Sequence, residues 1–195
     1  MIGIKFGNHK LGDEIGIINM GSYETCPSRK LGLCKTVNAG IKCYAKKPEE
    51  RFKEHVLTYR NNQEVYWKNT SKEQIVKDIL KKVKARRKKT KYIRLNESGD
   101  FWCQEDVAKV DYIAKELKRS SKIVVYGHTS RSDLDFTKCS ALIKGSGHDK
   151  GNNGMSTVIG KHDDVPANYI ECPGNCRKCN LCRKDISINI AFRKH

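Results

Sequence analysis

Seven of the nine cysteines fall into two groups, and their spacing makes them the residues best suited to chemistry. The denser group, C-x3-C-x2-C-x2-C, is formed by Cys172, Cys176, Cys179 and Cys182. Thiolates packed this closely in one loop are typical of an iron–sulfur cluster, and the spacing is close to a bacterial ferredoxin run read in the opposite direction. Structural zinc more often uses two ligand pairs separated by a longer insert, so zinc remains the alternative.

The sparser group, Cys26, Cys34 and Cys43 in C-x7-C-x8-C, lies in a polar loop spanning residues 21–47. Three thiolates on a four-iron cluster leave one iron open to a substrate or to water. A closed site needs a fourth ligand, for which Cys103 is the available candidate, and three unrelated thiols are the other interpretation. We expect one or two 4Fe-4S clusters, or one arrangement of all seven cysteines, and interpret Cys103 and Cys139 mainly as structural residues.

The composition limits the class of protein. The chain has 195 residues with 39 Lys+Arg against 22 Asp+Glu, and its formal net charge of +17 makes a polyanion or an anionic substrate an expected partner. No apolar run approaches the roughly 18 residues of a membrane span, and the amino end lacks the layout of a secretory signal. We expect a cytoplasmic protein without a membrane partner, whose cysteines are not a disulfide framework.

One run in the middle of the chain, residues 81–91, contains eight cations and no acidic residue. Cations that face phosphates release counterions on binding, so this run favours contact with nucleic acid. The other interpretation is a solvated helix end, where cations complement the helix dipole.

The elements that position these residues follow from hydrophobic periodicity. Apolar stripes predict helices from Pro48 onwards, after a capping box of Thr70 and Glu73, and over residues 105–118. Short apolar runs predict strands at residues 15–20, 92–95, 122–126, 141–143, 157–159, 169–170 and 186–192. This alternation predicts a single α/β domain over residues 1–195, a partial (β/α) barrel or a curved, mostly parallel sheet with helices outside.

In such folds ligands bind at the carboxyl ends of the strands, and polar residues follow the predicted strand ends. Glu97 and Asp100 follow one strand, and His128 and Arg131 follow the next. We predict that these four line a pocket as catalytic residues, with a helix-capping turn and an inert turn histidine as the alternatives. Both cysteine loops are expected on this same rim.

Smaller polar residues in these segments are predicted to bind a cofactor. Ser98 and Gly99 lie between the two carboxylates, and Thr129 follows the histidine. Lys144 precedes glycine-rich residues that share some features with an anion-cradling loop, although the full phosphate-loop pattern is missing.

Several short motifs together resemble a known family. They are Cys26-Pro27, Cys34, Cys43-Tyr44-Ala45, the segments 97–101 and 125–130, and the loop from Cys172-Pro173 to Cys182. This set resembles the phage-type gene-product-eighty-eight family, whose members are similar to radical S-adenosylmethionine (SAM) barrels. The resemblance implies an iron–sulfur protein on a barrel-like scaffold, encoded by a phage and located in the host cytoplasm, with Tyr44 among the cofactor-binding residues.

Two features differ from the radical SAM pattern. Those enzymes usually bind the cluster through C-x3-C-x2-C in the loop after the first strand, whereas that spacing occurs here at Cys172, Cys176 and Cys179. No Gly-Gly-Glu run is present to hold the amino group of SAM, a role that Glu97 or Asp100 could take.

The main hypothesis is an iron–sulfur protein that acts as a reductive or radical-SAM-like enzyme on an anionic or nucleotide-type substrate, with an electron donor protein as a partner. Two other function classes remain open. One is a nucleic-acid-binding module with a structural metal site, and the other is an electron-transfer protein.

Overall fold

One sheet of eight strands organises the protein, in the spatial order β1-β2-β3-β4-β5-β6-β8-β7. The computed structural model describes residues 3–8 and 10–194. All neighbouring strands are parallel except β1 (Lys5–Phe6), which pairs antiparallel with β2 (Ile15–Ile18). The remaining strands are β3 (Tyr92–Leu95), β4 (Val124–Thr129), β5 (Leu142–Ser146), β6 (Met155–Ile159), β7 (Tyr169–Glu171) and β8 (Asn189–Arg193).

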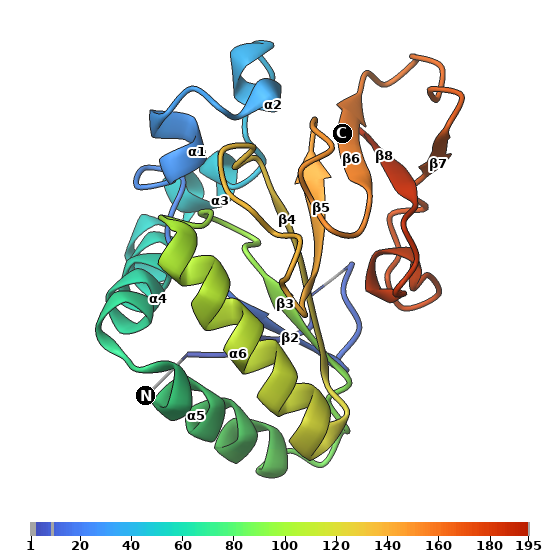
Figure 1. Cartoon of the computed structure of the whole chain (residues 1–195). Helices are drawn as coiled ribbons and strands as arrows, with labels where there is room; N and C mark the ends of the chain where they lie inside the picture. The colour runs from blue at the N-terminus through green and yellow to red at the C-terminus, as the bar shows by residue number, and fades with distance from the viewer. Residues whose placement is uncertain (1–2, 9, 195) are drawn as a thin grey trace.

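The sheet is open, with β1 and β7 at its two edges (Figure 1). The expected α/β fold with a mostly parallel, partly barrel-like sheet is therefore confirmed. Within the described residues, no helix has both the length and the apolar character needed to cross a bilayer.

Three long helices cover one face of the sheet: α4 (Thr58–Asn69), α5 (Lys72–Lys84) and α6 (Gln104–Ser121) (Figure 1). The cap of α5 is Ser71, whose hydroxyl accepts a hydrogen bond from the Gln74 amide at 3.2 Å. The predicted cap at Thr70 is wrong by one residue, because Thr70 instead ends α4 in an extended conformation.

The segment between β2 and α4 consists of short helical pieces. These are α1 (Pro27–Lys30), α2 (Lys35–Asn38), α3 (Lys46–Arg51) and the π-helical turn η1 (Lys53–Leu57). The helix predicted from Pro48 is interrupted at Phe52, which has φ −127° and ψ 51°. Its ring is 48% exposed, so Phe52 does not anchor the helix face that the apolar spacing predicts.

The sheet buries apolar side chains on both faces, as expected for parallel strands. Beneath the helices, Ile93 and Val125 belong to the larger core together with Leu117 of α6. On the opposite face, Ile17 and Tyr126 belong to a smaller cluster against which Cys176 and Cys182 pack, beside Leu11 and Ile15. The C-terminal cysteine loop thus covers the face that the three helices leave free.

Strands β4 and β5 run further than their apolar patterns predict. His128 pairs with Lys144 and Thr129 with Gly145 across the two strands, so none of these residues lies in a turn. Glycine following each apolar run predicted the end of the strand, but a Cβ at Gly145 would lie 2.1 Å from the His148 carbonyl oxygen. The glycine permits a close backbone approach within the strand rather than ending it.

Candidate functional site

The first cysteine group stands at the carboxyl end of β2, directly before the short helices. Cys26 precedes α1, and Cys34 precedes α2. Burial, together with negative charge on Asp100, Cys34 and Cys43, raises the pKa of Cys26 to about 12. Burial also raises the pKa of Cys43, and negative charge on Cys34 acts in the same direction. The fold therefore brings together the three thiols that the sequence grouped.

Asp100 holds this cysteine loop against the rest of the rim. Its carboxylate accepts hydrogen bonds from the hydroxyls of Ser28 at 2.6 Å and Thr129 at 2.7 Å. It also accepts from the amides of Ser130 at 2.8 Å and Phe101 at 2.9 Å. Burial raises the pKa of Asp100. The residue joins α1, the segment after β3 and the end of β4, which makes it a positioning residue.

Glu49, which the sequence pattern did not single out, forms a second buried anchor. It accepts hydrogen bonds from the Ser98 hydroxyl at 3.0 Å and from the Arg60 guanidinium at 2.6 Å. It also accepts from the backbone amide of Tyr23 at 2.9 Å. Glu49 and Arg60 are eleven residues apart, and a buried ion pair at that separation has no local sequence signature, so the sequence offered no signal for Glu49.

Gly99 is required where the segment after β3 meets the loop after β2. Its φ is +75°, and a Cβ there would lie 2.6 Å from the backbone nitrogen of Gly21. Because any side chain would collide with backbone, Gly99 permits this contact between the two segments. Gly99 therefore has a packing role, and its role in cofactor binding stays a prediction.

Glu97 and Tyr44 stand at the open side of this rim. Glu97 accepts a hydrogen bond from the Asn8 side-chain amide at 2.8 Å. The Tyr44 ring is 62% exposed, and its hydroxyl interacts electrostatically with Arg94 and Glu97. These two predicted site residues lie close enough to act on one ligand.

The C-terminal cysteine loop leaves β7 and folds back across the free face of the sheet. At its start, the Cys172 amide donates a hydrogen bond to the Ala191 carbonyl at 2.8 Å. The Cys176 amide donates to the Lys10 carbonyl at 3.0 Å. Lys10 precedes β2, so the loop extends to the amino end of that strand. The expectation that both cysteine loops share one rim is wrong for this part of the loop.

Arg183 fixes the path of this loop from within. Its guanidinium donates to the Cys176 carbonyl at 2.7 Å, to the Cys179 carbonyl, and to the Glu14 carboxylate at 2.9 Å. It also stacks 4.3 Å from the centre of the Tyr92 ring. One buried side chain thereby connects two cysteine-bearing turns to the sheet.

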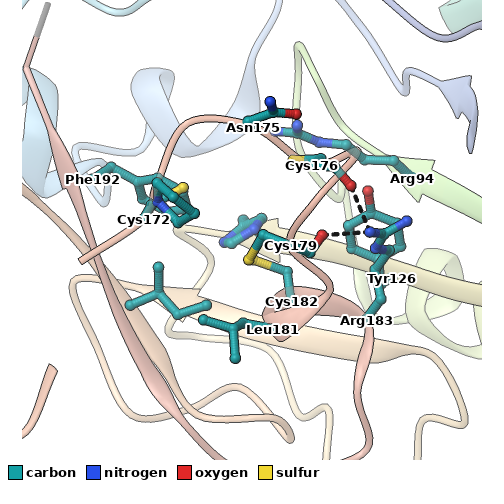
Figure 2. Close-up of a pocket in the computed structure, with 13 residues that line it drawn as sticks. Arg94, Tyr126, Cys172, Asn175, Cys176, Cys179, Leu181, Cys182, Arg183 and Phe192 are labelled. Atoms are coloured by element: carbon teal, nitrogen blue, oxygen red, sulfur yellow. Dashed lines mark hydrogen bonds between the residues drawn. The ribbon is translucent and has the colours of Figure 1, made fainter. Parts of the chain in front are cut away.

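A hollow lies between this loop and the sheet, with the four cysteines around it (Figure 2). Its cavity volume is about 40 Å³, and it is partly open to solvent. Its other walls include Arg94, Tyr126 and Phe192, and none of its lining residues is Asp or Glu. The donor set around the hollow therefore consists of thiols with cationic and aromatic neighbours.

Arg94, on β3, contributes a positive charge to the wall of the hollow, and its guanidinium is not fully hydrogen-bonded. Its buried Nε has no hydrogen-bond partner among the described residues. Burial raises the pKa of Cys182 to about 12, and the charge of Arg94 acts in the opposite direction. Arg94 also interacts with Tyr44 and Glu97, so it is the residue between the hollow and the open rim.

His128 lies in the wall of the hollow, on β4. Its Nδ1 is 3.1 Å from the Ser156 hydroxyl, and its ring meets Phe192 edge-on at 5.4 Å. Burial, with Arg94 and Lys144 nearby, lowers the pKa of His128 to about 3. The imidazole is therefore neutral at pH 7.

Lys144 and Arg131 are both held by protein groups. The fully buried ammonium of Lys144 donates to the Ile188 carbonyl at 2.7 Å and to the Asn153 carbonyl. Arg131 donates to both oxygens of Asp133 at 2.7 Å and to the Phe101 carbonyl at 2.6 Å. These bonds make both cations structural supports of the rim. The catalytic role of Arg131 and the cofactor-binding role of Lys144 stay predictions.

The two remaining cysteines stand apart. Cys103 is exposed at the start of α6, where its electrostatic partners are Glu105 and Asp106. Cys139 is buried in the core beneath the helices. Neither is among the groups that act on Cys26 or Cys43.

Within the described residues, no three His, Cys, Asp or Glu side chains gather closely enough to hold a single metal ion. A single zinc ion binds sulfur at about 2.3 Å, which places tetrahedral sulfurs about 3.8 Å apart. The described thiols are not assembled at that spacing.

The comparisons with known proteins bear on the first cysteine loop and the strand ends. The sequence model of the family described as gene product 88 matches residues 4–169. This range contains Cys26, Cys34, Cys43 and the segments 97–101 and 125–130, and it ends before the C-terminal cysteine loop. No curated protein and no solved structure matches the chain. Since the match covers well over half of the 195 residues, the chain belongs to the gene product 88 family.

Proposed function

We propose that the protein is an iron–sulfur protein with two 4Fe-4S sites. The first site comprises Cys26, Cys34 and Cys43, and the second comprises Cys172, Cys176, Cys179 and Cys182. One observation carries the proposal: the four cysteines of one short loop surround a hollow that is walled by Arg94 and Arg183 and contains no carboxylate. Such surroundings suit a thiolate-bound cluster of net negative charge.

The donor set fits a cluster better than a single ion. All the ligand atoms proposed for both sites are thiol sulfurs, which is the ligand type of iron–sulfur clusters. A four-iron cluster spreads its thiolate ligands around a cube, whereas a single tetrahedral ion draws four ligands to one point. Zinc therefore becomes the alternative that the metal analysis must exclude.

The chain's own residues position and shield the second site. Arg183 holds the carbonyls of Cys176 and Cys179, which orients the two cysteine-bearing turns. Arg94 places its charge beside Cys176 and Cys182, which favours their thiolate forms. Phe192 and Tyr126 contribute aromatic rings to the wall of the hollow.

The first site is the one at which we propose chemistry. When bound, the clusters supply one-electron transfer, and coordination by three cysteines leaves one iron free to bind a substrate. Asp100 positions the loop, while Glu97 and the exposed Tyr44 stand at the open rim. We propose a reductive or radical-SAM-like reaction on an anionic or nucleotide-type substrate, supplied with electrons by a donor protein.

Metal analysis after anaerobic purification tests the two sites separately. We expect broad absorbance near 400 nm with about eight irons and matching acid-labile sulfide per chain. Cys34→Ser and Cys179→Ser should each retain about four irons. Cys103→Ser is the control, because Cys103 is exposed and belongs to neither proposed ligand set, and it should retain all eight. Zinc without sulfide would refute the proposal.

Reduction in the presence of SAM tests the enzymatic part. We expect release of 5′-deoxyadenosine by the wild-type protein and none by Cys34→Ser, with Cys103→Ser unaffected. Reversible reduction of both clusters without SAM cleavage would instead identify an electron-transfer protein.

A further inference from the structure

A strongly basic surface runs from α5 to the outer side of the C-terminal cysteine loop. It begins at the carboxyl end of α5 and continues through residues 85–91 to the C-terminal cysteine loop. We call the following exposed cations the basic surface: Lys81, Lys84, Arg87, Lys88, Lys89, Lys91, Arg177 and Lys178. A groove connects its two parts, since Lys88, Lys89 and Lys91 line it on one side and Arg177 on the other.

The segment that carries these cations is held in one conformation. Arg86 donates to the Asp13 carbonyl at 2.9 Å and stacks 3.6 Å from the centre of the Phe6 ring. The Lys91 amide donates to the Glu14 carbonyl at 2.9 Å. Because the backbone is fixed at both ends of the segment, ligand binding does not require the segment to become ordered and avoids that loss of entropy.

Most of the charge on this surface is not neutralised by the protein. The groove contains two carboxylates: Asp13 pairs with Lys88, and Glu14 pairs with Lys91 at 3.2 Å and with the buried Arg183. Within the described part of the chain, Lys84, Arg87 and Lys89 form no ion pair. Adjacent like charges left unpaired raise the attraction for a polyanion.

The chemistry of the surface favours nucleic acid over a membrane. Proteins that lie on anionic bilayers insert apolar side chains beside their cations. The large hydrophobic side chains that the described residues expose are elsewhere, at Leu31, Tyr44, Phe52, Val65, Ile170 and Ile186. A surface with a large excess of cations and no exposed large apolar side chain matches the evenly spaced phosphates of a nucleic acid backbone.

We propose that the basic surface binds the phosphate backbone of nucleic acid, independently of sequence. The backbone would pass from the end of α5 over residues 85–91 to Arg177. This inference does not rest on the iron–sulfur proposal, because six of the eight cations belong to α5 and residues 85–91, and the groove shares no lining residue with the hollow.

Fluorescence anisotropy with a labelled 20-base-pair duplex of random sequence tests the proposal, between 50 and 200 mM KCl. The test variant carries Lys84→Gln, Arg87→Gln and Lys89→Gln, which are exposed and unpaired, so the fold should survive; circular dichroism checks this. The matched control carries Lys138→Gln, Lys150→Gln and Lys161→Gln, three exposed cations elsewhere with the same change in net charge.

Each phosphate contact contributes about 0.9 to the slope of log affinity against log salt for duplex DNA. We expect the test variant to bind at least tenfold more weakly at 0.1 M salt, with the slope reduced by about 2 to 3. The control should stay within about twofold of wild type. A single-stranded RNA of the same length should show the same ranking with slopes nearer 0.7 per contact.

Three results would overturn the proposal. They are absence of binding to either nucleic acid at 50 mM salt, equal weakening of the test and control variants, and tighter binding to vesicles containing anionic phospholipid than to the duplex. Cys34→Ser should bind the duplex like the wild type, because the first cysteine group contributes no cation to the basic surface, so failure of that iron–sulfur site does not affect this readout.

Discussion

The two cysteine regions are anchored by opposite charges. Around the first loop the buried anchors are the carboxylates of Asp100 and Glu49, whereas the buried anchor of the C-terminal loop is the guanidinium of Arg183, beside which Arg94 adds a second positive charge. Carboxylates disfavour thiolates nearby, and cations stabilise them. The comparison teaches that the second region is electrostatically prepared for an anionic occupant, while the first relies on the metal itself to offset its negative charge.

The regions also differ in how they are placed. The first loop stands at the carboxyl ends of parallel strands, in the position where this class of fold carries its chemistry, and it lies within the residues that match the gene product 88 family. The C-terminal loop lies across a face of the sheet, beyond those residues, and reaches the amino end of β2. This separation supports a division between a reactive site and a shielded one.

Removing the carboxylate of Asp100 should have the largest effect on this comparison. Asp100→Ala leaves the Ser28 and Thr129 hydroxyls and the Ser130 amide without their acceptor, which costs about 3 to 6 kcal/mol of unfolding free energy. In metal-free protein, thiol labelling should accelerate at Cys26 and remain slow at Cys182. Urea unfolding measures the first effect. Equal acceleration at both cysteines would show that the regions are not independently anchored.

Acid should loosen the second region first. The pKa of His128 is about 3 in the folded protein and near 6.5 when unfolded, so the unfolded chain binds an extra proton between these values. Stability is therefore present above pH 6.5 and lost as the pH falls toward 3, at about 1.4 kcal/mol per pH unit. Hydrogen exchange of metal-free protein should show β4 and β8 opening first, and His128→Gln should flatten the dependence. An unchanged pH profile in that variant would refute the assignment.

Breaking the arginine anchor should affect the second region alone. Arg183→Gln leaves the Cys176 and Cys179 carbonyls and Glu14 without their charged donor, which costs about 2 to 3 kcal/mol. Labelling of Cys176 should accelerate while that of Cys26 does not. Arg177→Gln, an exposed cation on the same loop, is the control and should change neither rate. Loss of both regions in Arg183→Gln would contradict the separation.

A distant helix cap provides the smallest effect and a reference for the others. Ser71→Ala removes the acceptor for the Gln74 amide at the start of α5, which costs about 1 kcal/mol, while Ser71→Asp retains a cap. Because α5 packs chiefly against α6, labelling of Cys26 and Cys182 should increase by the same small factor in Ser71→Ala. Unequal changes would mean that α5 supports one of the regions.

Local patterns were sufficient for much of this architecture. The stripe from Ile75 to Val83 predicted α5, and the apolar run at residues 92–95 predicted β3 without error in its bounds. The patterns failed where glycine stands inside a strand, so that β4 and β5 extend past Gly127 and Gly145. The glycines there serve close packing, and packing partners are not visible in a local window.

By itself, the sequence determined the strand–helix alternation, the two groups of cysteines and the basic run, because each is a property of residue type and spacing along the chain. Only the tertiary structure decided what lies beside them. It placed Arg94 of β3 and Arg183 around the C-terminal cysteines, and it placed Asp100 beneath Cys26. Charge acts through space between residues far apart in the chain, so the electrostatic contrast between the two regions arises only when the sheet brings those residues together.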